Sequence, residues 1–226
     1  MPNKPTKRDR REASRAARME AEKRAAKQRR MRFLYGGLGT GLVIALIVAL
    51  VLFSGSDTKV NTTTLNKAAS AAGCTAIQDI PDQGRSHIQP PATFKYNSNP
   101  PTSGSHYAIT GTAPAPTGVH TAPIQDEFQV HNLEHGHIGI QYAPTLPTSV
   151  IDALETFTSS HDTYVFMAPR PTLPTGVQLA FTRWDNLVDC ASPTDASAVV
   201  SFAAKFYDAY HGNGPEGAIP GTPISQ

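Results

Sequence analysis

The sequence predicts a single-pass membrane protein whose external part folds as one α+β domain. A run of 21 residues without a charge, residues 33–53, separates a short basic part from a long part of ordinary composition. The long part has short stretches with the period-two alternation of strands and two stretches with helical spacing, but no long strand–helix–strand series. This combination is typical of a small, mostly antiparallel sheet with two helices.

The first 32 residues form a basic segment. They carry 13 Lys/Arg against 4 Asp/Glu, a net charge of +9, whereas the remaining 194 residues have a net charge of −7. The isoelectric point of about 8.6 therefore describes this segment and not the folded domain, so it does not indicate binding to nucleic acid. We expect residues 1–32 to lie in the cytoplasm and to contact anionic lipid headgroups, or to serve only to fix the membrane topology.

Residues 33–53 predict a transmembrane helix. At about 1.5 Å per residue the run spans roughly 30 Å, the thickness of a bilayer's hydrocarbon core. The alternative is a cleaved signal peptide, whose apolar region is about 7–15 residues long and ends at a small-residue cleavage site. Residues 54–57 match such a site poorly. Because the basic residues precede the span, we expect residues 54–226 outside the cell membrane.

The two cysteines, Cys74 and Cys190, lie near opposite ends of the external part. A single cysteine pair in an oxidising compartment usually forms a disulfide. We therefore expect this bond, and two free, buried thiols are the alternative.

The external part begins irregularly and continues with regular elements. Its composition predicts a linker over residues 54–72, a domain over residues 73–220 and a tail over residues 221–226. The Pro-Pro and Ser-Gly dipeptides of residues 96–107 exclude a helix and predict an ordered loop. The later patterns predict strands over residues 128–130, 138–142, 164–168 and 177–182, a helix over residues 149–159, and a helix from the start signal Ser192-Pro193-Thr194-Asp195 to Gly212.

Residues 131–137, HNLEHGH, concentrate more groups that bind metals or move protons than any other stretch. The first five match the H-x-x-E-H pattern of inverted zinc proteases, a mechanism that needs a helix of several turns. Gly136 and Gly139 follow at once, and the residues after Gly136 alternate like a strand. We therefore predict a turn that leads into a strand, and not a protease helix.

In a strand, alternate side chains point to the same side, so His135 and His137 would share a side. His131 is also an even number of residues from both and would lie on that side if the turn kept the alternation. His106, in the loop of residues 96–107, is the best candidate for a further ligand. Imidazoles that converge on one face suit zinc, copper, nickel or iron. Glu134 is a candidate ligand, an orienting carboxylate or a proton carrier. The alternative is a polar network that binds no metal and closes the loop onto the sheet.

The other candidate groups are expected to be structural. Met167 lies in an apolar stretch and is expected in the core instead of at a copper site. Arg183 and Trp184 are expected to pack around the disulfide. Four isolated histidines are expected at the surface or in caps: His87, His120, His161 and His211.

Two long motifs and two shorter features occur together: YNSNPPTSGSHY at residues 96–107, VHNLEHG at residues 130–136, Cys190, and Pro215-Glu216. Over about residues 73–217 this set resembles a family of bacterial extracytoplasmic proteins described only as a domain of unknown function. Members of that family are commonly anchored by one N-terminal span. The resemblance implies no activity, and it implies that the position of His137 is usually small or apolar. It implies a shared signature made of His106, Tyr107, His131, Glu134, His135 and Gly136.

The sequence favours a non-catalytic domain that binds or handles copper or zinc through His106, His131 and His135, with Glu134 and His137 as further ligands. One alternative is a metal-dependent hydrolase with Glu134 as the base. Another is a cell-envelope binding module in which the histidines are structural. Membrane lipid is the expected partner, and the sequence identifies no protein partner.

Overall fold

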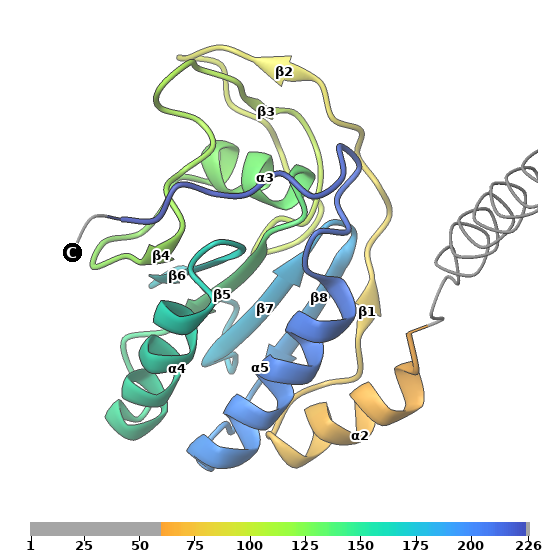
Figure 1. Ribbon diagram of the computed structural model, residues 1–226, viewed down its shortest axis with the longest axis vertical. Coiled ribbons are helices and arrows are strands. Elements are labelled where there is room, and N and C mark those ends of the chain that lie inside the picture. Colours follow the sequence, from red (N-terminus) through yellow and green to blue (C-terminus); the bar gives the residue numbers. More distant parts are fainter. Residues whose placement is uncertain (1–59, 225–226) are drawn as a thin grey trace, which may run out of the picture. The chain divides into compact units, whose positions relative to one another are not determined.

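The computed structural model describes residues 60–224, which form an α+β domain with four helices and a six-stranded sheet (Figure 1). The predicted basic segment and transmembrane helix lie outside these residues. Within residues 60–224, no helix is long and apolar enough to cross a membrane. The elements are α2 (Thr62–Ala71), β1 (Gln78–Asp79), β2 (His87–Ile88), β3 (His106–Tyr107), β4 (Gly118–Val119), α3 (Asp126–Glu134), β5 (Ile138–Tyr142), α4 (Thr148–Ser160), β6 (Val165–Pro169), β7 (Leu179–Arg183), β8 (Asn186–Cys190) and α5 (Ala196–Tyr210).

The sheet has the strand order β1-β8-β7-β5-β6-β4. The pairs β1–β8, β8–β7 and β7–β5 are antiparallel, whereas β5–β6 and β6–β4 are parallel. Parallel neighbours need a crossover, and α4 supplies it between β5 and β6. The predicted class, α+β with a mostly antiparallel sheet, is confirmed, but the domain has four helices where two were predicted. β2 and β3 form a separate two-stranded parallel ladder.

The main core lies between one face of this sheet and the helices α2, α4 and α5; Figure 1 shows α4 and α5 along the sheet and α2 beside the end of α5. The predicted apolar stripes of α4 and α5 are buried there, and so is Met167, as expected. This core includes Ile138 and Ile140 from β5, Val150, Leu154 and Phe157 from α4, and Val199, Phe202 and Phe206 from α5.

A second, smaller core lies on the opposite face of the sheet. Phe166 alternates with Val165 and Met167 along β6 and packs with Val130 and Leu133 of α3. Trp184 belongs to this second core, whereas Cys190 belongs to the main one, so the expected packing of Trp184 around the disulfide is wrong. Arg183 instead lies over the ring of Tyr210, 4.5 Å from its centroid.

Residues 126–134 form helix α3, so the strand predicted over residues 128–130 is wrong. Asp126 and Glu127 lie in the first turn, where negative charge stabilises the helix dipole. Seven of the nine residues of α3 are buried, because the sheet covers one side and irregular chain covers the other. A helix buried on all sides lacks the amphipathic spacing that identifies a helix in a sequence.

Gly136 ends α3 in a left-handed conformation with φ of 80°. Its N–H donates to the carbonyl of Leu133 at 3.0 Å, and the N–H of His137 donates to the carbonyl of Asn132 at 3.0 Å. These two bonds are the Schellman motif, in which glycine is preferred at the left-handed position. Gly136, on which the prediction of a turn in place of a helix depended, is therefore the residue that terminates the helix.

The domain extends beyond the predicted bounds of residues 73–220. In the predicted linker, α2 is capped by the side chain of Asn61 and buries Leu65 and Ala69 in the main core. In the predicted tail, backbone hydrogen bonds join residues 222 and 224 to Thr117. The disulfide between Cys74 and Cys190 is confirmed and joins the segment after α2 to the end of β8.

Candidate metal centre

Four side chains from three segments converge at the C-terminal end of α3. His131 and Glu134 lie in its last turn, and His87 and His106 lie on β2 and β3. The parallel register pairs His87 with His106, so their ring centroids are 5.0 Å apart. One nitrogen from each histidine and one oxygen from Glu134 all lie within 4.8 Å of one another. This group is called the inner group below.

His106 is fully buried and contacts a partner through each ring nitrogen. Nδ1 lies 2.9 Å from the carbonyl oxygen of Gly104, and Nε2 lies 2.9 Å from Oε2 of Glu134. Because a carbonyl oxygen only accepts hydrogen bonds, Nδ1 carries a proton. A lone pair on Nε2 would face a carboxylate oxygen, so either a second proton or a cation must lie between them.

His131 is oriented in the same way. Its Nδ1 donates to the carbonyl oxygen of Tyr107 at 2.6 Å, which leaves Nε2 as the lone-pair nitrogen of the neutral ring. Burial, aided by the neighbouring histidines, lowers the pKa of His131 to about 4 in spite of this hydrogen bond. Metal-binding histidines are commonly oriented by an N–H bond to a backbone carbonyl. His131 is thus a neutral imidazole at pH 7, with its ring held in one orientation and the lone pair of Nε2 free to bind a cation.

Glu134 is the acidic member of the inner group and is 1% exposed. Its Oε2 lies 2.9 Å from Nε2 of His106 and 3.6 Å from Nε2 of His87. Two ligands of a tetrahedral zinc ion, each bound at about 2.0–2.1 Å, lie about 3.3 Å apart. The two observed distances lie on either side of this value, so each pair has about the spacing of two ligands of one ion.

A second group adjoins the first and shares one residue with it. Ligand atoms of Glu134, His135 and Glu216 lie within 4.8 Å of one another, and we call these residues the outer group. Nε2 of His135 lies 3.3 Å from Oε2 of Glu216, whose side chain is 38% exposed. Burial lowers the pKa of His135, although the carboxylates of Glu216 and Glu134 oppose the shift.

The first four residues of the H-x-x-E-H pattern lie in the last turn of α3 and His135 is its C-cap, contrary to the predicted turn, but the pattern does not form a protease-like site. The rings of His131 and His135 are one turn apart with centroids separated by 4.5 Å. However, the two histidines belong to different groups, and Glu134 belongs to both. In the protease pattern both histidines bind one ion and the glutamate acts as a base.

His137 lies apart from both groups. Its Nε2 donates to the carbonyl of Ile219 at 2.8 Å, and its Nδ1 accepts from the side-chain amide of Asn132 at 3.0 Å. The side chain is fully buried, and burial lowers the pKa of His137 to about 4. The predicted pairing of His135 with His137 on one side is not found, since Gly136 reverses the chain between them.

The structure therefore brings together three of the predicted ligands, His106, His131 and Glu134, and assigns His135 to the neighbouring group. His87 was expected to be isolated, and its place depends on a two-residue strand that has no recognisable sequence pattern. Glu216 lies in one of the features that resemble the family of unknown function, and this was the one available signal for it.

Most of the folded domain matches a known protein family. Residues 87–221 match the family described as "Protein of unknown function (DUF3105)". The chain belongs to this family. The matched region begins at His87 and extends past Glu216, so it contains every member of the inner and outer groups. No curated protein and no solved structure matches the chain significantly.

Proposed function

We propose that this chain is a membrane-anchored extracytoplasmic protein that binds a divalent transition metal, zinc or copper, through the inner group. One observation carries the proposal. Two buried imidazoles, those of His106 and His131, donate their Nδ1 protons to backbone carbonyls and leave Nε2 available beside the buried carboxylate of Glu134. Fixed tautomers around a buried anion are the arrangement that proteins use to bind a cation.

A metal-free network needs one more proton at the contact between His106 and Glu134. If His106 is neutral, its Nε2 lone pair and Oε2 of Glu134 are both acceptors at 2.9 Å. The metal-free protein must therefore hold an additional proton at this contact. A metal ion would displace that proton, and metal binding would release it to the solvent.

The ligand chemistry selects among metals. Three imidazoles and one carboxylate suit zinc and copper(II), whereas copper(I) prefers thiolate and thioether ligands. Within residues 60–224 both cysteines form the disulfide, and Met167 is fully buried in the main core. The inner group therefore favours divalent ions, with copper(II) bound more tightly than zinc.

The position of Glu134 favours binding over hydrolysis. A general base must reach a water molecule or a substrate, but Glu134 is 1% exposed and contacts His106 directly. His87, with 48% of its side chain exposed, is the member of the inner group that solvent reaches. This arrangement agrees with a carboxylate that is a ligand.

The proposed location comes from the sequence. The uncharged run at residues 33–53 would anchor the chain, and the basic residues before it would hold the N-terminus in the cytoplasm. The disulfide of Cys74 and Cys190 supports an oxidising compartment for the domain.

The test uses the full chain in detergent, without a polyhistidine tag, stripped of metal and then titrated with Cu²⁺ or Zn²⁺. Trp184 is the single tryptophan, and its ring centroid lies 6.4 Å from that of His106, so bound Cu²⁺ should quench its fluorescence. We expect saturable binding that His87→Ala weakens by roughly tenfold or more and that Glu134→Gln abolishes.

His120→Ala is the matched control, because His120 belongs to neither group. It should bind metal like the natural protein. Absence of saturable binding, or equal affinity in the natural protein and in Glu134→Gln, would refute the proposal. Hydrolysis would instead be indicated if Glu134→Gln retained its metal and lost activity on an ester or peptide substrate.

A further inference from the structure

We propose that Glu134 bridges two metal ions, one held by the inner group and one held by the outer group. The inference rests on the proposed function, because it adds a second ion beside the first. The outer ion would have three protein ligands: Glu134, His135 and Glu216. It would be a divalent transition metal with at least one coordination position left for water or a small anion.

The carboxylate of Glu134 is placed to serve both ions. Its contacts with His106 and His87 both use Oε2, which leaves Oε1 for another partner. The His131 and His135 rings belong to different groups, and their centroids are 4.5 Å apart. Ions in carboxylate-containing two-metal sites lie about 3.5–4 Å apart, which suits neighbouring ligand rings at this separation.

The outer ligands are held by the chain segment that follows α5, residues 212–219, called the 212–219 turn. The N–H of Glu216 donates to the carbonyl of Glu134 at 3.2 Å, and the N–H of Ile219 donates to the carbonyl of His135 at 3.2 Å. Gly214 packs against the backbone of Glu134 and Gly136 so closely that no side chain fits there. The turn thus fixes Glu216 beside the last turn of α3.

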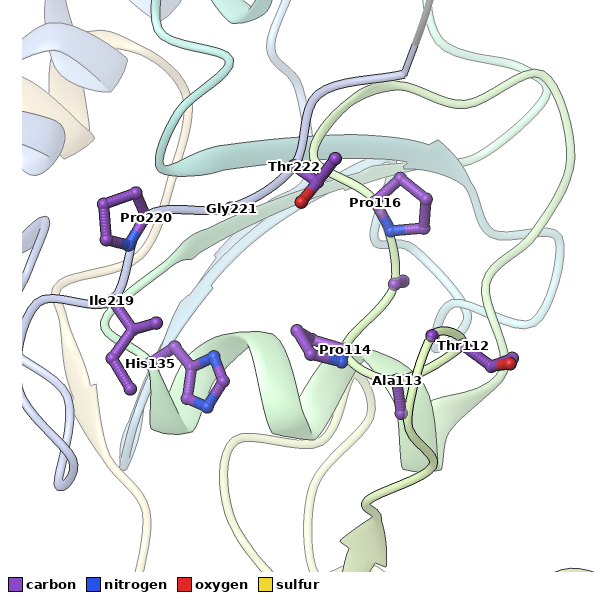
Figure 2. Close-up of a pocket in the computed structure, with 11 residues that line it drawn as sticks. Thr112, Ala113, Pro114, Pro116, His135, Ile219, Pro220, Gly221 and Thr222 are labelled. Carbon is purple, nitrogen blue, oxygen red and sulfur yellow. The ribbon is translucent and has the colours of Figure 1, made fainter.

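A cavity of about 360 Å³ opens beside the outer group. Figure 2 shows His135 at this cavity, across from Pro114 and Pro116 and next to Ile219. None of the members of the inner group lines it. Of the outer group, His135 lines the cavity, whereas Glu134 and Glu216 do not, so a small anion in the cavity would approach an outer ion from the side of His135.

The two positions also differ in their ligand chemistry. The inner group supplies three nitrogens and one oxygen, whereas the outer group supplies one nitrogen and two oxygens. Sites rich in imidazole bind zinc and copper more tightly than sites rich in carboxylate. Titration should therefore fill the inner position first and the outer position at higher metal concentration.

The experiment measures stoichiometry on the full chain in detergent, by equilibrium dialysis against Zn²⁺ followed by metal analysis. We expect two equivalents for the natural protein, one for Glu216→Gln, and none for Glu134→Gln. Glu216 is partly exposed, so its substitution is not expected to prevent folding. Glu155→Gln, which removes a carboxylate of α4 outside both groups, is the control and should keep two equivalents.

A second measurement tests the bridge. With two equivalents of Cu²⁺, ions that share Glu134 should be magnetically coupled, so that the electron paramagnetic resonance signal of isolated copper(II) is lost. Glu216→Gln should restore the signal of one isolated copper(II). Two uncoupled signals in the natural protein would overturn the bridge.

The outcomes separate this inference from the proposed function. One equivalent in the natural protein, unchanged in Glu216→Gln, would overturn the second site and leave the inner site intact. No bound metal in the natural protein would overturn both.

Discussion

Gly214→Ala tests how the 212–219 turn is attached to α3. A methyl group at this position would overlap the carbonyl of Glu134 and the amide nitrogen of Gly136, which are backbone atoms that cannot rotate away. The turn would have to move off the end of the helix. We therefore expect loss of the outer ligand Glu216 together with a loss of stability.

The magnitude follows from the backbone hydrogen bonds that hold the turn. Three such bonds hold it, and each contributes a net of about 0.5–1.5 kcal/mol, so loss of all three should lower the free energy of unfolding by roughly 1.5–4.5 kcal/mol. The three bonds join Gly212 N to Gly136 O at 2.8 Å, Glu216 N to Glu134 O at 3.2 Å, and Ile219 N to His135 O at 3.2 Å.

Urea denaturation followed by Trp184 fluorescence measures this effect, since the only tryptophan of the chain lies in the second core of the folded domain. Gly217→Ala is the matched control in the same turn. Gly217 has φ of 86°, but a methyl group added to its Cα would meet no atom within 4 Å, so only the left-handed backbone should cost about 1–2 kcal/mol. If Gly214→Ala lost no more stability than Gly217→Ala and kept the same metal content, the argument for close packing would be wrong.

Three further predictions concern the rest of the domain. Replacement of both Cys74 and Cys190 by alanine removes a crosslink across 116 residues and should lower the free energy of unfolding by about 5 kcal/mol on the chain-entropy model. A loss below about 1 kcal/mol by urea denaturation would contradict that. For His137, the folded pKa of about 4 lies below the unfolded value of about 6.5, so its contribution is present above pH 6.5 and is lost as the pH falls towards 4. The contribution of His137 is on the order of 3 kcal/mol, and His131 has a similarly lowered pKa. His137→Gln should therefore reduce, but not abolish, the pH dependence of the stability of the metal-free protein over this range, whereas an unchanged slope would exclude His137 as a cause. Arg170 donates to both carboxylate oxygens of Asp126, at 2.6 and 3.2 Å. Arg170→Ala should therefore lower the free energy of unfolding, measured by urea denaturation, by about 2–4 kcal/mol. Asp126→Asn should lower it by less, because the side chain of Asp126 is 34% exposed. Equal, small effects of the two substitutions would show that the pair is screened by solvent.

The parts of the fold that follow a regular period could be predicted from the sequence. The stripe of α4 and the alternation of β5 arise because one side of each element faces the main core. α3 could not be predicted in this way, because it is covered on both sides and buries polar side chains such as Gln129 and Asn132. α2 was missed for the opposite reason, since only Leu65 and Ala69 of its ten residues are buried.

The candidate site could be located from the sequence but not assembled from it. His106, His131 and Glu134 occur in two long motifs, which identify the region. The contribution of His87 depends on its parallel register with His106, nineteen residues away, and pairing between two-residue strands leaves no pattern. His137 was included because the spacing of a strand would place it on the same side as His135, but the Schellman motif at Gly136 directs its ring towards Ile219.

The short β2–β3 ladder also bears on how quickly a metal would exchange. Its two residue pairs include His87, the half-exposed member of the inner group, while the other members are buried. A strand of two residues opens locally at a far lower free energy than the whole domain unfolds. Exchange of the inner ion would then follow the opening rate of β2, and an occupied site should slow amide hydrogen exchange in this ladder more than in the main core.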